Sequence, residues 1–285
     1  MMITGPKIST VDDLVATIPN GTRLGVPADY SGVPMTATRA LIRRKVEDLH
    51  LYCLPLTTIQ GDMLIGAGCV TSIEAAAVTL GEYGLAPRFS DAFEAGELDM
   101  RDSTCPALHA QLQAAEKGVP FMPLRGLLGT DILKHRPDWK VIDNPFATNA
   151  HGSEDEYADP IVLLPATKLD VALIHAQSAD RNGNVWIGRK RDLATMVHAA
   201  DRTLVTVEEV RDTDFLENEN QTAGVLPALY VDEIAVAPNG AWPCALHGLY
   251  EEDASELRAY ASAARTREGF RRYLDERVFQ ELEVA

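Results

Sequence analysis

The sequence predicts an α/β protein with an open, mainly parallel sheet that is flanked by helices. Short apolar segments alternate along the chain with longer amphipathic ones, as they do in repeated units of strand, helix and strand. Glycine and proline interrupt the sequence between these segments, which is typical of the turns that connect them. At 285 residues the chain can bury one large core, so we expect a single domain over residues 1–285.

Strands are expected where apolar residues run together over a few positions. These positions are residues 22–25, 49–54, 70–77, 119–124, 161–164, 171–175, 203–207 and 233–237. Amphipathic segments predict helices over residues 34–47, 107–117, 192–200 and 254–281, the last within a C-terminal helical segment at about 252–285. Pro34 suits the first turn of its helix, where a missing N–H is tolerated. The acidic residues 149–159 predict an exposed loop.

The composition argues against several classes of function. A formal net charge of −16 disfavours nucleic acid as a partner, because its phosphates would meet a repelling field. The four cysteines are far apart and form no C-x-x-C pair, so we expect reduced thiols, no disulfides and no metal site. The apolar runs are too short to cross a membrane, and the N-terminus lacks the pattern of a signal peptide. We therefore expect a cytoplasmic protein.

In so acidic a chain, an anionic ligand would need a local basic patch. The best candidate is the cluster of Arg39, Arg43, Arg44 and Lys45, in which the first two share a helix face by their four-residue spacing. A solvated helix end with cations near its C-terminus explains the same cluster and is the favoured interpretation.

The first place to look for a ligand site is the segment of residues 168–188. An apolar strand runs there into His175, Ala176 and Gln177, and an Asn-Gly-Asn turn follows at residues 182–184. In parallel α/β proteins, ligands bind past the carboxyl ends of strands. At strand spacing His175 and Gln177 face the same side, where a general base or a hydrogen-bond donor could act. A structural histidine with satisfied hydrogen bonds is the alternative.

A second candidate is the glycine-punctuated sequence GDMLIGAG of residues 61–68, which we expect to be a turn after an apolar strand. The backbone N–H groups of Gly61, Asp62 and Met63 could then approach an anion closely. The segment matches neither G-x-x-x-x-G-K-[ST] nor the full G-x-G-x-x-G nucleotide fingerprint. A turn needed only for packing is the alternative.

A third candidate is the loop after the strand expected at residues 119–124. It begins with Arg125 and continues through Gly126, Gly129 and Thr130. The planar donor fork of Arg125 suits a carboxylate, a thioester oxygen or a phosphate. A salt bridge between Arg125 and one of the many acidic residues is an equally good interpretation.

No convincing nucleophile emerges from the sequence. There is no Ser, His and Asp order with a G-x-S-x-G elbow, which argues against a hydrolase triad. Cys105 and His109 are four apart on an expected helix, but a third member is missing and packing is the better explanation. The glutamates of residues 216–221 (LENENQ) are expected on a solvated surface loop.

Several segments together resemble the first, or alpha, subunits of family I coenzyme A transferases, most closely the alpha chains of glutaconate CoA-transferases. They follow the family's order and cover most of the chain. The I-D-N-P-F and D-V-A-x-I-H-A-Q elements are the most specific of them. The matching segments are GDMLIGAGCV (61–70), RFSDAFEAGELDM (88–100), AAEKGVPFMPL (114–124), VIDNPF (141–146), LDVALIHAQSADRNGNV (169–185), RTLVTVEEV (202–210) and VDEIAVAPNGAWPCALHGLYEED (231–253).

The resemblance implies the open α/β fold of CoA transferases and an enzyme that works as a complex with a beta subunit. In the family's chemistry a glutamate that the beta subunit supplies attacks an acyl-CoA thioester, and CoA then passes to a second acid. The resemblance implies no catalytic residue in this chain, no bound cofactor, and coenzyme A thioester as a substrate. It also places Gly61, Asp62, Met63, Arg125, Gly126, Gly129, Thr130, His175 and Gln177 along the acyl side of the cleft.

The sequence departs from the family after the first strand. Alpha subunits of the family usually carry Gly-Gly and an aromatic residue there, whereas this chain has Gly25-Val26-Pro27-Ala28-Asp29-Tyr30. Proline has no N–H to donate to an oxyanion. From the resemblance, the leading hypothesis is the alpha subunit of a CoA transferase for a small or dicarboxylic acid. Its alternatives are a CoA-thioester or ring-opening hydrolase on the same scaffold, and a non-catalytic scaffold subunit.

Overall fold

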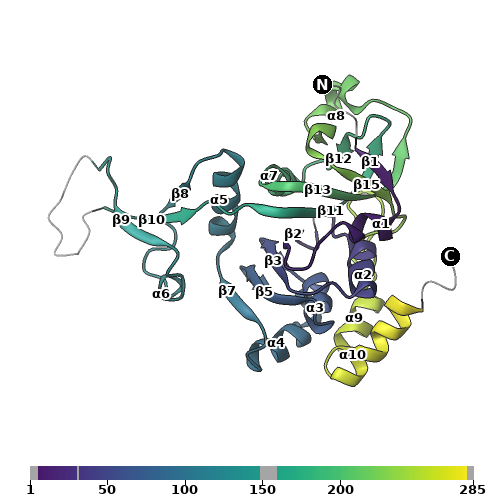
Figure 1. Ribbon diagram of the computed structural model, residues 1–285, viewed down its shortest axis with the longest axis horizontal. Helices are drawn as coiled ribbons and strands as arrows, with labels where there is room; N and C mark the ends of the chain where they lie inside the picture. Colours follow the sequence, from purple (N-terminus) through teal and green to yellow (C-terminus); the bar gives the residue numbers. More distant parts are fainter. Residues whose placement is uncertain (1–5, 31, 148–158, 281–285) are drawn as a thin grey trace.

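The computed structural model describes residues 6–30, 32–147 and 159–280, and it has a long, twisted sheet with helices on both faces (Figure 1). Every pairing along the main path of the sheet is parallel. The fold class predicted from the sequence is confirmed. In spatial order the strands are β1 (Lys7–Ser9), β15 (Glu233–Val236), β13 (Ala200–Arg211), β11 (Leu169–Asp180), β2 (Arg23–Pro27), β3 (Leu49–Leu54), β5 (Val70–Ala75) and β7 (Asp99–Asp102).

Alternate residues of each central strand enter two different cores. In β11, Val171 and Leu173 belong to one core, whereas Ala172 and Ile174 belong to the other. Both faces are therefore covered, which explains why these strands are continuously apolar in the sequence. The first core lies under α1 (Val11–Ala16), α2 (Met35–Arg44), α3 (Ile59–Gly66) and the C-terminal helices, and the second under α5 (Cys105–Glu116) and α7 (Arg191–His198).

Shorter elements complete the fold. α4 (Pro87–Glu94) packs beside α3, and β12 (Val185–Trp186) and β14 (Val225–Leu226) extend the end of β11. The remaining ones are β4 (Leu56–Thr57), β6 (Ala77–Val78), α8 (Glu219–Thr222), and the single 3₁₀ turns at Gly81–Tyr83, Phe215–Glu217 and Ala228–Tyr230.

The expected turn at residues 61–68 is wrong, because most of this segment forms α3. Gly61 leaves room for the side chain of Thr57, and a Cβ there would lie 2.3 Å from the Thr57 methyl group. Asp62 is fully buried; its carboxylate accepts hydrogen bonds from Phe89 N (2.8 Å) and Tyr260 Oη (2.6 Å). Met63 is also fully buried. These three residues hold elements together, and their side chains do not reach the surface.

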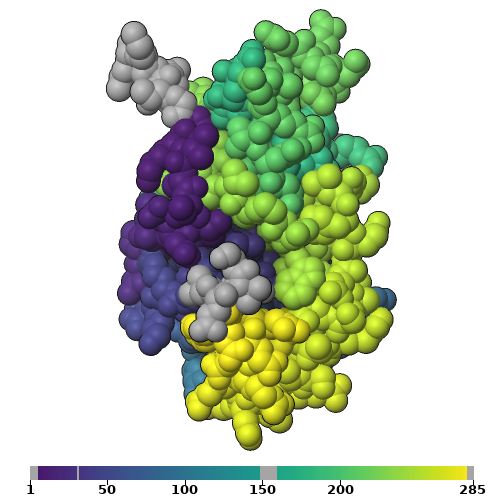
Figure 2. Space-filling model, turned by 90° about the vertical axis from the view of Figure 1, so that its right-hand side faces the viewer, coloured from purple at the N-terminus to yellow at the C-terminus, as the bar shows by residue number. Residues whose placement is uncertain are grey.

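Most of residues 254–279 are helical, but they do not form the one helix expected over residues 254–281. α9 (Ala254–Ala263) is followed by α10 (Arg267–Leu274), which ends in a π turn (Asp275–Phe279). The helix is interrupted before Thr266, whose hydroxyl accepts a hydrogen bond from Gly269 N and so caps the second helix. Figure 2 shows these helices in yellow beside the dark N-terminal part of the chain, and Arg43 of α2 donates a hydrogen bond to Val278 O.

Two of the expected strands, β8 (Phe121–Leu124) and β10 (Pro160–Pro165), belong to a separate small sheet. In it β10 pairs antiparallel with β8 and also with β9 (Lys140–Asp143), which was not expected. With α6 (Ile132–His135) they form an arm that extends from α5, away from the main sheet (Figure 1). The prediction of a loop at 149–159 falls outside the described residues, except at Asp159. In the part of the chain that the structure describes, no helix is long and apolar enough to cross a membrane.

We predict that Tyr260→Phe destabilises the protein. The substitution removes the hydroxyl that donates to the buried Asp62 carboxylate, and a lost hydrogen bond to a buried charged group lowers the free energy of unfolding by about 1–3 kcal/mol. Urea unfolding measures the difference. Tyr230→Phe, at a tyrosine that is 42% exposed, is the matched control and should change stability by less than about 0.5 kcal/mol. Equal effects would show that the Asp62 contact contributes nothing.

Candidate active site

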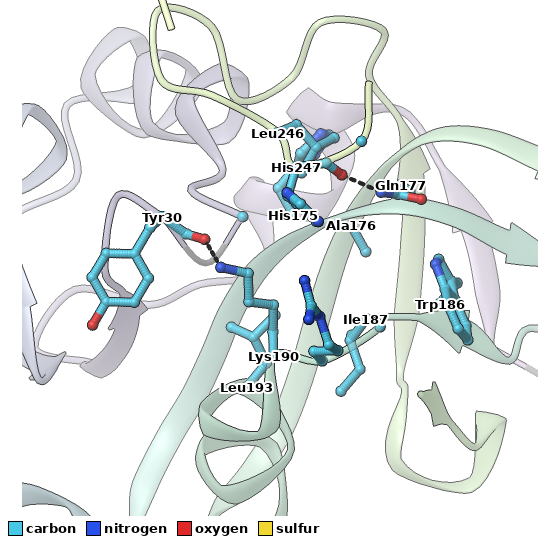
Figure 3. Close-up of a pocket in the computed structure, with 14 residues that line it drawn as sticks. Tyr30, His175, Ala176, Gln177, Trp186, Ile187, Lys190, Leu193, Leu246 and His247 are labelled. Carbon is cyan, nitrogen blue, oxygen red and sulfur yellow. Dashed lines mark hydrogen bonds between the residues drawn. The ribbon is translucent and has the colours of Figure 1, made fainter. Parts of the chain in front are cut away.

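A cavity of about 580 Å3 opens beside the second half of β11 (Figure 3). Four segments of the chain form its walls. They are the loop after β2 with Tyr30 and Gly32, residues 175–177 of β11, residues 186–190 with Leu193, and residues 246–248. The cavity therefore lies beyond the carboxyl end of β2, where ligands of parallel sheets bind.

His175 forms part of the wall and is fully buried. It lies opposite Thr206 in the pairing of β11 with β13, and its Nδ1 is 2.8 Å from Thr206 Oγ1. Its Nε2 is 2.9 Å from the Glu208 carboxylate. Both ring nitrogens are thus engaged inside the protein, which favours a structural histidine over a general base.

Gln177 lines the same cavity, as its spacing from His175 predicts. Its side-chain amide donates a hydrogen bond to the backbone oxygen of His247, which ties β11 to the loop on the opposite wall (Figure 3). The expectation that these residues follow the strand is wrong, because β11 continues to Asp180 in register with Arg211 of β13. The Asn-Gly-Asn turn then leads into β12.

Glu208 is the centre of the hydrogen-bond network behind the cavity. Besides His175 it accepts hydrogen bonds from Tyr250 Oη (2.6 Å), Asn239 N (2.6 Å) and Gly240 N (3.1 Å). Burial raises the pKa of Glu208, but the hydrogen bonds from His175, Tyr250 and Asn239 outweigh it and hold the pKa below its usual 4.5. Sequence analysis missed this residue, and its only signal is the acidic end of an apolar strand.

Gly32 brings the backbone of the loop after β2 against His175. Its oxygen accepts a hydrogen bond from His175 N (2.9 Å), and its φ of +86° is in the left-handed region. A Cβ at this position would lie 2.1 Å from His175 O. Val26 and Pro27, where the resemblance led us to expect Gly-Gly, lie inside β2 and are buried. Gly32 therefore makes the close approach.

The open side of the cavity is basic and apolar. Arg189 and Lys190 lie between β12 and α7, next to apolar surface from Trp186, Ile187 and Leu193. The Lys190 ammonium donates a hydrogen bond to the backbone oxygen of Tyr30 and lies 5.1 Å from the centre of its ring. Among the described residues that line the cavity, none is Asp, Glu, Ser or Cys.

The loop that begins with Arg125 lies elsewhere, on the arm. Arg125 forms a two-pronged ion pair with Asp159, so the salt bridge that we weighed as an alternative is present. It lines a separate cavity of about 370 Å3, which shares no residue with the one beside β11. Gly126 and Gly129 are exposed on the same arm, and so is Thr130.

The other candidates from the sequence do not line the cavity beside β11. Arg39 is buried, stacks over Trp242 and donates a hydrogen bond to its backbone oxygen. Cys105 is exposed at the start of α5, and burial lowers the pKa of His109 on the same helix. Glu217 and Glu219 are solvent-exposed, as expected.

We predict that Gly32→Ala is more destabilising than Gly68→Ala. Both glycines have positive φ, so each substitution carries the left-handed penalty of about 1–2 kcal/mol. Only at Gly32 would the new Cβ also collide with backbone, which adds about 1–3 kcal/mol; at Gly68 the space is open. Urea unfolding of both variants measures the difference. Equal losses would mean that the loop can move away from His175 freely.

We predict that Glu208→Gln weakens the fold mainly above pH 4.5. The lowered pKa of Glu208 means that its carboxylate contributes stability above the usual value of 4.5 and loses this contribution as the pH falls through the folded-state pKa. The variant should be about 1–3 kcal/mol less stable at pH 7, with a gap that narrows towards pH 3. Glu209→Gln, at the exposed neighbour, is the control and should show little change at any pH. A gap that does not vary with pH would contradict the assignment.

Comparisons with known proteins give a family match over most of the chain. The family model for coenzyme A transferase matches residues 8–237. The A subunit of 3-oxoadipate CoA-transferase from Pseudomonas knackmussii is 33% identical over 86% of this chain and 83% of that protein. The A subunit of glutaconate CoA-transferase from Acidaminococcus fermentans is 30% identical over 96% of this chain and 88% of that protein.

Two further matches extend the comparison. The crystal structure of glutaconate coenzyme A-transferase from Acidaminococcus fermentans superposes with a TM-score of 0.85 and 29% identity, covering 96% of this chain and 89% of that one. The cholesterol ring-cleaving hydrolase IpdA subunit of Rhodococcus jostii is 28% identical over 94% of this chain and 90% of that protein. From the family match and the identity to two A subunits over most of its length, we conclude that this chain belongs to the coenzyme A transferase family.

Proposed function

We propose that this chain is the alpha subunit of a CoA transferase that moves CoA between an acyl-CoA and a small or dicarboxylic acid in the cytoplasm. In this proposal a beta subunit supplies the glutamate nucleophile, and the cavity beside β11 forms one half of the active site. The observation that carries the proposal is the make-up of that cavity. Its described lining offers hydrogen-bond donors, cations and apolar surface, but no carboxylate, hydroxyl of serine or thiol.

The proposed reaction needs a carboxylate, which the described lining of this cavity does not provide. The glutamate of the partner attacks the thioester carbonyl, expels CoA thiolate and forms a mixed anhydride. The thiolate then attacks the glutamyl carbonyl, which gives a glutamyl-CoA thioester and releases the first acid as its carboxylate. The second acid reverses these two steps and leaves with CoA. No oxidant, reductant or metal is required for the balance.

This chain would bind and orient the acyl group. Gln177 and the backbone around His175 line the cavity. The network through Glu208 fixes His175, and the hydrogen bond to the backbone oxygen of His247 fixes Gln177. We give His175 a positioning role because both of its ring nitrogens already have partners. We leave the arm and the buried helix α3 out of the proposed site, which removes these expected residues: Arg125, Gly126, Gly129, Thr130, Gly61, Asp62 and Met63.

A hydrolase is the second candidate. One relative in the family is a ring-cleaving hydrolase, and the Val26-Pro27 pair departs from the Gly-Gly that is usual in transferases. Water would then take the place of the second acid. The two candidates differ in product, because a transferase delivers CoA to an added acid and a hydrolase releases it free.

We predict that the purified chain alone has no transferase activity and that its complex with the beta subunit does. The complex is incubated with acyl-CoA, and intact-mass spectrometry compares the two proteins. A CoA adduct should appear on the partner and none on this chain, and replacement of the partner's glutamate by glutamine should abolish both adduct and transfer. Activity of the chain alone, or an adduct on it, would overturn the half-site proposal. Free CoA in place of transfer would favour the hydrolase.

A further inference from the structure

The cavity beside β11 carries a charge opposite to that of the whole protein. The chain has 42 acidic and 26 basic residues, so its overall field repels anions. Among the described residues, no ion pair joins Arg189 or Lys190 to an acid. The Glu208 carboxylate, which lies behind the cavity wall, is already engaged by four donors. The two cations therefore create a local positive field.

Tyr30 holds Lys190 in place, and the nearby carboxylate of Asp29 interacts with its charge without forming an ion pair with it. Its ammonium contacts the backbone oxygen and the ring face of Tyr30, so its position is fixed while its full charge remains. An ammonium has three donors, and this contact uses one of them. Both cations also precede the first turn of α7, whose unpaired N–H groups add partial positive charge, although Asp192 in the same turn offsets part of it.

The surface next to the cations suits a short hydrocarbon. Trp186, Ile187 and Leu193 line the same side of the cavity, and Leu246 lies on the loop across it. A ligand with a carboxylate at one end and a short apolar spacer would satisfy both surfaces. The far end of such a ligand would then reach towards Gln177 and His247 (Figure 3).

We propose that Arg189 and Lys190 bind the non-reacting carboxylate of a dicarboxylic substrate, and that Arg189 determines the preference for dicarboxylic over monocarboxylic acids. This inference rests on the proposed function. Arg189 is the main discriminator because its planar fork forms two parallel hydrogen bonds to a carboxylate. A monocarboxylic acid leaves this fork empty, so removing the guanidinium affects only the dicarboxylic substrate.

The test compares acids of equal length in the complex with the beta subunit. Straight-chain dicarboxylic acids of four to eight carbons, each with its monocarboxylic counterpart, serve as CoA acceptors. In Arg189→Gln, kcat/KM for the best dicarboxylic acid should fall about 10- to 100-fold, whereas that for the matching monocarboxylic acid should change less than about threefold. Arg181→Gln removes the same charge outside the cavity and should leave both unchanged.

Other outcomes would overturn the inference. An equal fall with both kinds of acid, together with a higher KM for the acyl-CoA, would assign the cations to the CoA phosphates. An unchanged kcat/KM for the dicarboxylic acid would remove Arg189 from the site. Circular dichroism and thermal unfolding show whether the variant is folded.

Calorimetric titration of the same acids separates this inference from the proposed function. If the wild-type complex transfers CoA to no acid, the transferase proposal fails, but a preference for binding dicarboxylic acids that Arg189→Gln removes would still support the cation site. Absence of that preference in the wild-type complex would reject it.

Discussion

The Glu208 carboxylate is the contact on which the shape of the cavity depends. It forms hydrogen bonds with His175 of β11, with Tyr250 of the loop before α9, and with two backbone N–H groups of the turn at residues 239 and 240. These donors come from three segments that are far apart in the sequence. A buried carboxylate is stable only when such donors replace its water, so the segments must stay together for it to remain charged. The network therefore gives the cavity a rigid back wall.

Two glycines lie so close to His175 that neither position has room for a side chain. Gly32 contacts its backbone, and a Cβ on Gly240 would lie 2.4 Å from its ring. Side chains at either place would push the loops away from β11 and open the network. The position of the cavity thus follows from a buried histidine, whose ring acts as a packing and hydrogen-bonding element.

Sequence analysis found the parts of this fold that depend on local pattern. The apolar run at residues 49–54 has the same bounds as β3, and α2, α5 and α7 begin within a few residues of their expected positions. The pattern failed where distant contacts decide. Residues 61–68 have turn-like glycines, but most of them form a helix in which the buried Asp62 accepts hydrogen bonds from Phe89 and Tyr260. Glu208 could not be recognised, since its partners depend on the pairing of β11 with β13.

If this chain forms only half of the active site, its structure reveals more about the ligand that binds than about the reaction that the complex catalyses. Its relatives include subunits of two CoA-transferases at 30–33% identity and of a ring-cleaving hydrolase at 28%, so similar chains accompany different chemistry. If the nucleophile belongs to the partner, a change of reaction need not alter the walls that this chain provides. In the proposed half-site the walls would still select the acid, because charge and apolar surface act on every substrate that enters. Among related chains, residues such as Arg189 and Trp186 should therefore change with the substrate, whereas the network around Glu208 should be present wherever the fold is the same.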